Sequence, residues 1–163
     1  MTLAARGRRK ALAWAAVAAV IVAALGSVAT DTGPWYQQLK QPGWKPPDGV
    51  FGAVWTVIYA CAVIAASYAW EQAPSRRHRI TVLALFALNA VLNLAWSLLF
   101  FRSQRPDWAL WEVFFLWGSV LLLMAYTARF SPRCAWLLVP YLMWVAIAAA
   151  LNREVVALNG PFG

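Results

Sequence analysis

The chain has 163 residues, of which 63% are hydrophobic and only 12% are charged. Soluble globular domains carry about 25% charged residues, so this composition excludes an ordinary soluble protein and indicates a membrane protein. The formal net charge is +8. Because basic residues at helix ends suit anionic lipid head groups, the charge requires no nucleic acid, and membrane lipid is the expected partner.

Five segments are long enough to cross the hydrocarbon layer, which takes about 20 apolar residues. They are predicted at about 11–30, 50–70, 80–101, 108–128 and 134–152. The connections after the first loop, at about 31–49, are short, so consecutive helices should be antiparallel neighbours. The sequence therefore predicts an all-α integral membrane protein whose residues 1–163 form one domain, a single bundle of five transmembrane helices.

The first segment has an alternative interpretation as a cleaved secretory signal, because the basic run RGRRK precedes an apolar stretch. The uncharged run from Ala11 to Thr30 is longer than the apolar region of a signal, which is about 7–15 residues. It also carries small residues at Ala15, Ala19 and Ala23, which allow another helix to approach closely. We therefore assign it as the first membrane helix.

Lysine and arginine are divided unequally between the two sides of the predicted bundle. The side of the N-terminus holds nine: Arg6, Arg8, Arg9, Lys10, Arg76, Arg77, Arg79, Arg129 and Arg133. The opposite side holds five: Lys40, Lys45, Arg102, Arg105 and Arg153. Because short cytoplasmic loops are enriched in basic residues, we expect a multi-pass protein of a bacterial cell membrane with a cytoplasmic N-terminus and an outward-facing first loop.

Residues suited to metal or acid–base chemistry are sparse. His78 lies in the run RRHR, where a solvated basic loop explains it, and Cys61 and Cys134 belong to different segments. There is no metal-ligand spacing, glycine-rich phosphate loop or Ser-His-Asp set, so neither a metal nor a required cofactor is expected. Glu112, near the start of the fourth segment, is the acidic residue within a span, which does not favour an ion pump.

Tryptophan occurs 11 times. Trp35 and Trp44 lie in the first loop, and the other nine fall into two groups. Those near predicted helix ends, which the interfacial aromatic belt explains, are Trp14, Trp70, Trp108, Trp111 and Trp136. Those inside the predicted helices, which lipid packing alone does not explain, are Trp55, Trp96, Trp117 and Trp144.

Two predicted helices carry a polar and aromatic face. In the third segment the face consists of Asn89, Asn93, Trp96 and Ser97, and in the fifth of Tyr141, Trp144, Ala148 and Asn152. Burying an amide without a hydrogen bond is costly, so these faces should turn into the bundle, where the asparagines either bridge helices or line a pocket. Pro140 should kink the fifth helix near Tyr141.

The series WYQQLKQPGWKPPDGVFGAVWTVIY, LNAVLNLAWSLLFF and PYLMWVAIAAALN resembles the tryptophan-rich sensory protein or translocator protein family (TspO/MBR), also called the peripheral-type benzodiazepine receptor family. The resemblance covers essentially the whole chain in the right order. It rests on the W-Y, P-x-W-x-P-P and W-S-x-L-F-F elements together. It implies a five-helix bundle, often a homodimer, with a pocket on the loop side for porphyrins and other tetrapyrroles. In animals it also implies cholesterol and isoquinoline or benzodiazepine drugs as ligands.

Transferred to this sequence, the resemblance implies a binding pocket lined by Tyr36, Trp55, Asn93, Trp96, Tyr141, Trp144 and Ala148. The loop should act as a lid, because the prolines at 42, 46 and 47 stiffen it and its glycines allow sharp turns. This lid carries flat side chains with polar edges, Trp35, Tyr36 and Trp44, which are suited either to anchoring the lid at the membrane interface or to stacking on a planar macrocycle. Charge favours Lys40 and Lys45 as partners of porphyrin propionates.

Sterol binding is not expected at the C-terminal end. The cholesterol motif of the animal proteins needs a Tyr followed by a basic residue, whereas this chain continues REVVALNG after Asn152. Leu123, Tyr126 and Arg129 fit a loose form of the motif, which we interpret as coincidence.

Several functional classes remain open. They are a sensor or regulator of the tetrapyrrole or stress response, a tetrapyrrole carrier or exporter, a light-dependent porphyrin-degrading enzyme with Trp55 and Trp144 as catalytic residues, and a structural subunit without ligand. The first three share one pocket, so a protoporphyrin IX-like porphyrin is the expected ligand. A homodimer is expected through one of two small-residue faces: Ala15, Ala19 and Ala23, or Ala84, Ala87 and Ala90.

Overall fold

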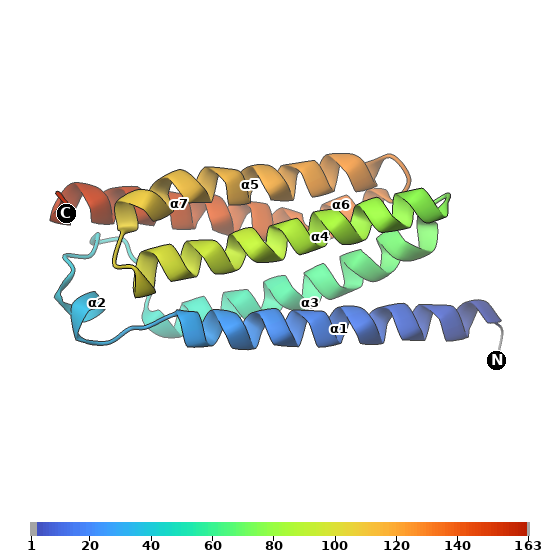
Figure 1. Ribbon diagram of the computed structural model, residues 1–163, viewed down its shortest axis with the longest axis horizontal. Helices are drawn as coiled ribbons and strands as arrows, with labels where there is room; N and C mark the ends of the chain where they lie inside the picture. The colour runs from blue at the N-terminus through green and yellow to red at the C-terminus, as the bar shows by residue number, and fades with distance from the viewer. Residues whose placement is uncertain (1–2, 163) are drawn as a thin grey trace.

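A computed structural model describes the backbone of residues 3–162 and the side chains of residues 10–162 (Figure 1). The side chains of Arg6, Arg8 and Arg9, which enter the charge count above, lie outside the described ones. The elements are α1 (Leu3–Ala29), α2 (Pro34–Gln38), α3 (Asp48–Gln72), α4 (Arg76–Ser97), the π-helical turn η1 (Leu98–Arg102), α5 (Pro106–Ala128), α6 (Pro132–Leu137) and α7 (Val139–Asn159). Residues 3–162 contain no strand.

Five helical spans are long and apolar enough to cross a membrane, and they confirm the predicted all-α integral membrane bundle. They run over Lys10–Ala29, Asp48–Gln72, Arg76–Arg102, Pro106–Ala128 and Pro132–Asn159. The fifth continues seven residues beyond the predicted end at 152. Arg153 and Glu154 end the apolar run in the sequence without interrupting the helix, which stops at the pair Gly160 and Pro161.

Proline and serine mark where the helices start. Pro34, Pro106 and Pro132 stand in the first turns of α2, α5 and α6, where the missing N–H would have no partner in any case. Ser75 caps α4, and its hydroxyl accepts a hydrogen bond from the backbone N–H of His78. The run RRHR therefore forms the first turn of a helix, and its assignment to a loop was wrong.

The predicted kink in the fifth span lies at Leu138, slightly before the expected position at Tyr141. There α6 ends and α7 begins, and Pro140 stands in the first turn of α7. A proline cannot donate to the carbonyl four residues before it and its ring crowds that carbonyl, so the distortion falls on the preceding turn.

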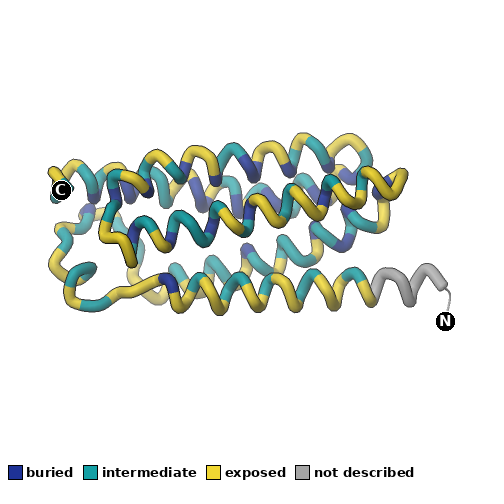
Figure 2. Tube along the Cα trace, in the orientation of Figure 1, coloured by how far each residue is buried: buried dark blue, intermediate teal, exposed yellow. Residues whose placement is uncertain are grey.

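The spans pack as an antiparallel bundle with its two termini at opposite ends (Figure 1). α5 packs between α4 and the fifth span, formed by α6 and α7, and α1 packs on α3 and α4. The buried residues of α5 include Ala109, Val113, Leu116, Val120, Leu123 and Thr127. Their alternating spacings of four and three place them on one helical face. Figure 2 shows that α1 is mostly exposed or half-buried.

Candidate ligand-binding site

A cavity of about 610 Å³ lies between the ends of α1, α3, α4, η1 and α7 on the side of the α1–α3 connection. This size falls within the usual range of small-molecule sites, about 300–1,000 Å³. Its walls combine aromatic and aliphatic side chains with hydroxyl, amide and charged groups. The lining includes Tyr36, Lys45, Asp48, Phe51, Gly52, Trp55, Tyr59, Asn93, Trp96, Phe100, Phe101, Trp144, Ala148 and Asn152.

Two aromatic pairs build one wall of the cavity. Trp55 stacks on Tyr59 with 5.5 Å between ring centroids, because the two residues lie one helical turn apart on α3. One turn before Trp55, Phe51 meets Trp144 of α7 edge to face, with 5.4 Å between centroids. The cavity therefore presents large flat rings held in place by other rings.

Hydrogen bonds between three helices form the deep end of the cavity. The Tyr59 hydroxyl of α3 donates to Oδ1 of Asn93 on α4 (3.3 Å), and Nδ2 of Asn93 donates to the Tyr141 hydroxyl of α7 (3.3 Å). Asn93 thus uses both ends of its amide to bridge helices while still bordering the cavity. The sequence left open whether Asn93 bridges helices or lines a pocket, and the structure shows that it does both.

The other two asparagines of the polar faces have structural partners. Asn89 donates to the hydroxyl of Ser119 on α5 (2.8 Å). The amide of Asn152, oriented to suit its neighbours, donates to the carbonyl of Pro106 and accepts from the N–H of Leu110, both at 3.0 Å. Asn152 therefore ties α7 to the first turn of α5 at the rim of the cavity, where helix-terminal groups need such partners.

The π-helical turn η1 shapes the wall formed by α4. The backbone N–H of Ser103 bonds the carbonyl of Leu98, five residues back, at 2.8 Å. This wider turn shifts the residues that follow relative to a regular α-helix, and such turns occur frequently at functional sites. The rings of Phe100 and Phe101 lie 5.3 and 6.1 Å from the ring of Trp96, which forms an aromatic cluster at the cavity.

The connection between α1 and α3, which we call the lid (residues 30–47), is attached to this cluster through α2. Trp35 meets Phe100 edge to face at 6.2 Å, and Tyr36 lies 5.5 Å from Phe101. These two aromatic contacts hold α2 of the lid against η1.

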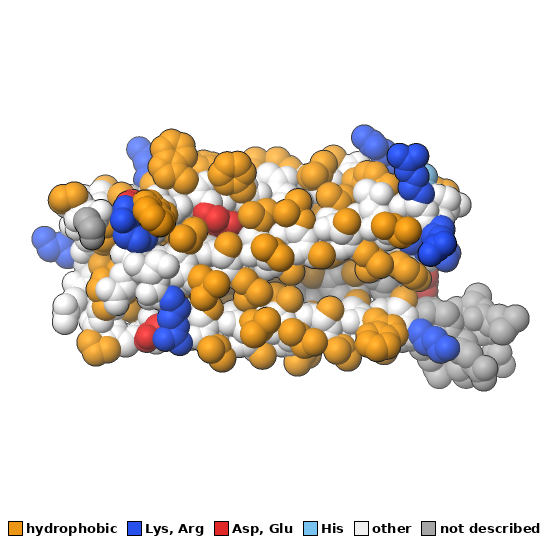
Figure 3. All heavy atoms as spheres, in the orientation of Figure 1, with side chains coloured by type: hydrophobic (Ala, Val, Ile, Leu, Met, Phe, Trp, Pro, Cys, Tyr) orange, Lys and Arg blue, Asp and Glu red, His pale blue; other side chains and the backbone are white. Residues whose placement is uncertain are grey.

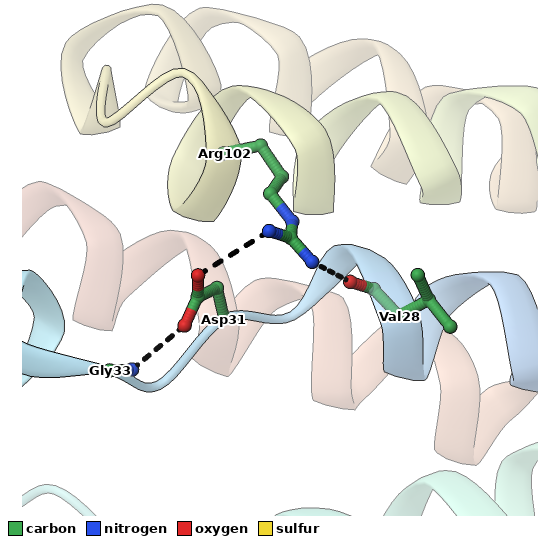
Figure 4. Close-up of polar contacts among 4 residues, drawn as sticks. All are labelled: Val28, Asp31, Gly33 and Arg102. Atoms are coloured by element: carbon green, nitrogen blue, oxygen red, sulfur yellow. Dashed lines mark hydrogen bonds and ion pairs between the residues drawn. The ribbon is translucent and has the colours of Figure 1, made fainter.

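An arginine fastens the start of the lid to the end of α4 (Figure 4). Nη2 of Arg102 donates to the carbonyl of Val28 at 2.6 Å, and Nη1 contacts the carboxylate of Asp31 at 3.4 Å. The other oxygen of Asp31 accepts from the backbone N–H of Gly33 at 2.9 Å. Arg102 therefore joins the last turn of α1, the lid and η1.

The end of the lid is attached to α7. Asn159 accepts from the backbone N–H of Lys40 (2.8 Å) and donates to its carbonyl (2.9 Å), while the indole N–H of Trp44 donates to the carboxylate of Glu154. The Trp44 ring is 49% exposed and does not line the cavity. Lys40 and Trp44 therefore anchor the lid to α7.

Of the two lysines of the lid, Lys45 lines the cavity and Lys40 does not. The ammonium group of Lys45 pairs with Asp48 and lies 5.3 Å from the centroid of the Tyr36 ring. Partial burial by itself lowers the pKa of Lys45, but the interactions with Asp48 and Tyr36 outweigh it, so the pKa lies above its ordinary value. Lys45 therefore stays protonated near neutral pH and is paired with Asp48 at the cavity mouth.

Of the eight predicted binding residues, six border this one cavity: Tyr36, Trp55, Asn93, Trp96, Trp144 and Ala148. Tyr141 is buried behind Asn93, and Trp44 lies outside. Phe51 and Tyr59 were not predicted to line the cavity, although they stand four residues before and after Trp55 and so share its helical face. Phe100 and Phe101 were not predicted either, because their positions depend on the π turn.

Among the described residues, no group of three or more His, Cys, Asp or Glu could hold a metal ion. The cavity lining likewise contains no His, Cys or Met. The cavity therefore presents aromatic faces along its walls and, at its mouth, the Lys45 ammonium paired with Asp48.

Comparison with known proteins gives concordant matches. The profile of the TspO/MBR family matches residues 14–158. The chain is 36% identical over 125 residues to the tryptophan-rich protein TspO of Chlorobaculum tepidum, covering 77% of this chain and 79% of that protein. It is 32% identical over 119 residues to the human translocator protein, with 72% and 70% covered. It is 30% identical over 143 residues to the protein CrtK of Rhodobacter capsulatus, with 88% and 89% covered.

Proposed function

Because the chain belongs to the TspO/MBR family, we propose that it binds a tetrapyrrole in the cavity beneath the lid and acts as a sensor or regulator of the tetrapyrrole or stress response. The observation that carries the proposal is the cavity itself, with Trp55, Phe51 and Trp144 as flat walls and Lys45 at the mouth. A porphyrin has the matching features of a large planar apolar ring with acidic substituents at its edge.

The lining also favours one mode of recognition. The described lining contains no His, Cys or Met, and its tyrosines are Tyr36 and Tyr59, of which Tyr59 donates its hydroxyl to Asn93. We propose that a bound porphyrin is held by its faces and its propionates and not by an axial ligand. We therefore expect a metal-free porphyrin and its metal complexes to bind with similar affinities.

The decisive experiment is a titration of the purified protein with protoporphyrin IX in the dark. Quenching of tryptophan fluorescence that saturates at one porphyrin per chain would support the proposal. Absence of saturable quenching in the wild-type protein would refute it and favour a structural subunit. Zinc protoporphyrin serves as the comparison ligand for the absence of axial ligation.

A second candidate function is light-dependent degradation of porphyrin. It is favoured by the placement of two oxidisable indoles, those of Trp55 and Trp144, at the wall of the same cavity. Illumination of the complex separates the candidates: loss of the porphyrin spectrum only in the light, and only with the folded protein, supports the enzyme. A carrier is tested by porphyrin efflux from proteoliposomes.

We also propose that the basic end of the bundle is cytoplasmic and that the lid faces outward. The described basic residues at the end with the α3–α4 connection are Lys10, Arg76, Arg77, Arg79, Arg129 and Arg133, against Lys40, Lys45, Arg102, Arg105 and Arg153 at the lid end. Figure 3 shows basic side chains at both ends of the visible face. A reporter fused after Gly163 should be active outside the cytoplasm, and one inserted between Pro74 and Arg79 inside.

For a homodimer, the structure favours one of the two predicted small-residue faces. Ala15, Ala19 and Ala23 of α1 are half-buried and line cavities within the protomer. Ala84 and Ala87 of α4 are exposed, and of these two only Ala87 also borders a cavity. We propose that a dimer forms through α4, which replacement of Ala84 by Trp should disrupt in crosslinking experiments in lipid.

A further inference from the structure

A second hollow, of about 670 Å³, lies between α1, α3 and α4 toward the end of the bundle opposite the lid. In Figure 3 the surface is recessed between α1 and α4 on the side of the N-terminus. Small side chains explain why it is not filled, since Ala15, Ala18 and Ala19 of α1 face Ala62 and Ala66 of α3 across it. We call this hollow the inner groove.

We propose that the inner groove binds one acyl chain of an anionic phospholipid from the surrounding bilayer, with its phosphate near Lys10 and Arg79. The length of the groove suits this occupant. On α1 it extends from Lys10 to Val22, about 18 Å at about 1.5 Å per residue. One leaflet occupies about half of a hydrocarbon layer of about 30 Å, so a single tail matches the groove.

The interior of the groove suits a hydrocarbon chain. Most of its lining is aliphatic or aromatic, and the polar groups at its deep end already have partners. Tyr59 and Tyr141 bond Asn93, and Asn89 bonds Ser119. A tail in the groove would therefore leave no unpaired polar group against it, which in hydrocarbon would be costly.

The mouth of the groove suits an anionic head group. Lys10 and the indoles of Trp14 and Trp70 line it, and the guanidinium of Arg79 lies 5.5 Å from the centroid of the Trp70 ring. Indoles are favoured at the level of lipid head groups, and basic residues there attract anionic lipids. No acidic residue is among the described lining.

A lipid phosphate at the mouth would neutralise Lys10 and Arg79, and this charge complementarity favours a lipid as the occupant. A second copy of the chain in the groove is one of the outcomes of the test.

The proposal is tested by native mass spectrometry of the full chain in mild detergent, titrated separately with palmitoyl-oleoyl phosphatidylglycerol and phosphatidylcholine. We expect one phosphatidylglycerol retained per chain, at concentrations at which phosphatidylcholine is not retained. Lys10→Gln and Arg79→Gln should each weaken retention of phosphatidylglycerol about fivefold. Arg129→Gln is the matched control, because Arg129 lies near the ring of Tyr126 at the same end and Tyr126 does not line the groove, whereas Arg79 lies near the ring of Trp70, which does.

Filling the groove provides an independent arm of the test. Ala18→Leu and Ala66→Leu place a larger side chain in the groove and should abolish retention. Ala13→Leu and Ala24→Leu are the controls, because these exposed residues of α1 do not line it. Thermal unfolding of each variant confirms that it is folded.

Three results would overturn the proposal. Equal retention of the two lipids would remove the role of the basic mouth, and undiminished retention by the folded groove-filling variants would place the lipid elsewhere. A dimer in the wild type that Ala18→Leu converts to a monomer would identify a second copy as the occupant. Porphyrin binding is not needed for any of these outcomes, so the test is independent of the function proposed for the lid cavity.

Discussion

Gly52 allows the lid cavity to be filled without disturbing the packing of the bundle. It lies on α3 and lines the cavity, and a Cβ atom added there would meet no heavy atom within 4 Å. Leucine is a far better helix former than glycine, by about 0.8–1 kcal/mol per residue. Gly52→Leu should therefore leave the free energy of unfolding unchanged or raise it by up to about 1 kcal/mol.

The same substitution should impair ligand binding. The leucine side chain would occupy space between Phe51, Trp55 and the ligand, and forcing extra methylene groups into an occupied site costs about 1–3 kcal/mol. The dissociation constant of protoporphyrin IX should rise about fivefold to 150-fold. The assay is the dark fluorescence titration, run beside a thermal unfolding measurement on the same sample.

Gly118→Leu is the matched control. Gly118 lies in α5, a Cβ atom there also meets nothing within 4 Å, and the residue does not line the cavity. We expect a similar gain in stability and no change in affinity. If folded Gly52→Leu binds protoporphyrin IX as tightly as the wild type, the ligand does not occupy this cavity and the reasoning fails.

Four further predictions follow from individual side chains. Trp144→Phe keeps most of the ring area, so dark affinity should fall by about 1 kcal/mol while any light-driven degradation drops sharply; an equal effect of Trp136→Phe, at an exposed position, would contradict the assignment. Asn93→Leu removes the bonds to Tyr59 and Tyr141 and should lower the free energy of unfolding by about 1–2 kcal/mol, which unchanged thermal stability would disprove. Arg102→Gln should speed proteolysis within the lid while costing no more than about 1 kcal/mol, since the Arg102–Asp31 pair is exposed; wild-type cleavage rates would show that other contacts hold the lid. Glu112→Gln should leave stability unchanged or raise it by about 1 kcal/mol, because both carboxylate oxygens are buried without a hydrogen-bond partner; a loss of more than about 1 kcal/mol would reveal a required charge.

The membrane spans were predictable from the sequence because hydropathy and length are local properties. A run of about 20 apolar residues must form a helix in a bilayer, since no water is present to bond the backbone. Pro106 and Pro132 likewise act on the turns next to them, and they stand where α5 and α6 start. The spacing of Asn93 and Trp96 placed both on one face, which the structure turns inward.

The roles of individual side chains depended on contacts between distant segments. Asn89, Asn93 and Asn152 look equivalent in the sequence, yet Asn89 bonds Ser119, Asn152 ties α7 to α5, and Asn93 borders the cavity. Trp44 was a stacking candidate by residue type alone, but Glu154, 110 residues away, accepts its N–H. Such pairings arise only when the helices are packed.

Empty space was the feature least accessible to sequence reasoning. The alanines of α1 and α4 predict close helix contact when each helix is considered alone, but together with Ala62 and Ala66 of α3 they surround one space and leave the inner groove. Sequence patterns report which side chains share a face, because the periodicity of a helix is local. Whether two facing surfaces meet or leave a cavity is set by the relative positions of whole helices, and only the tertiary structure determines those positions.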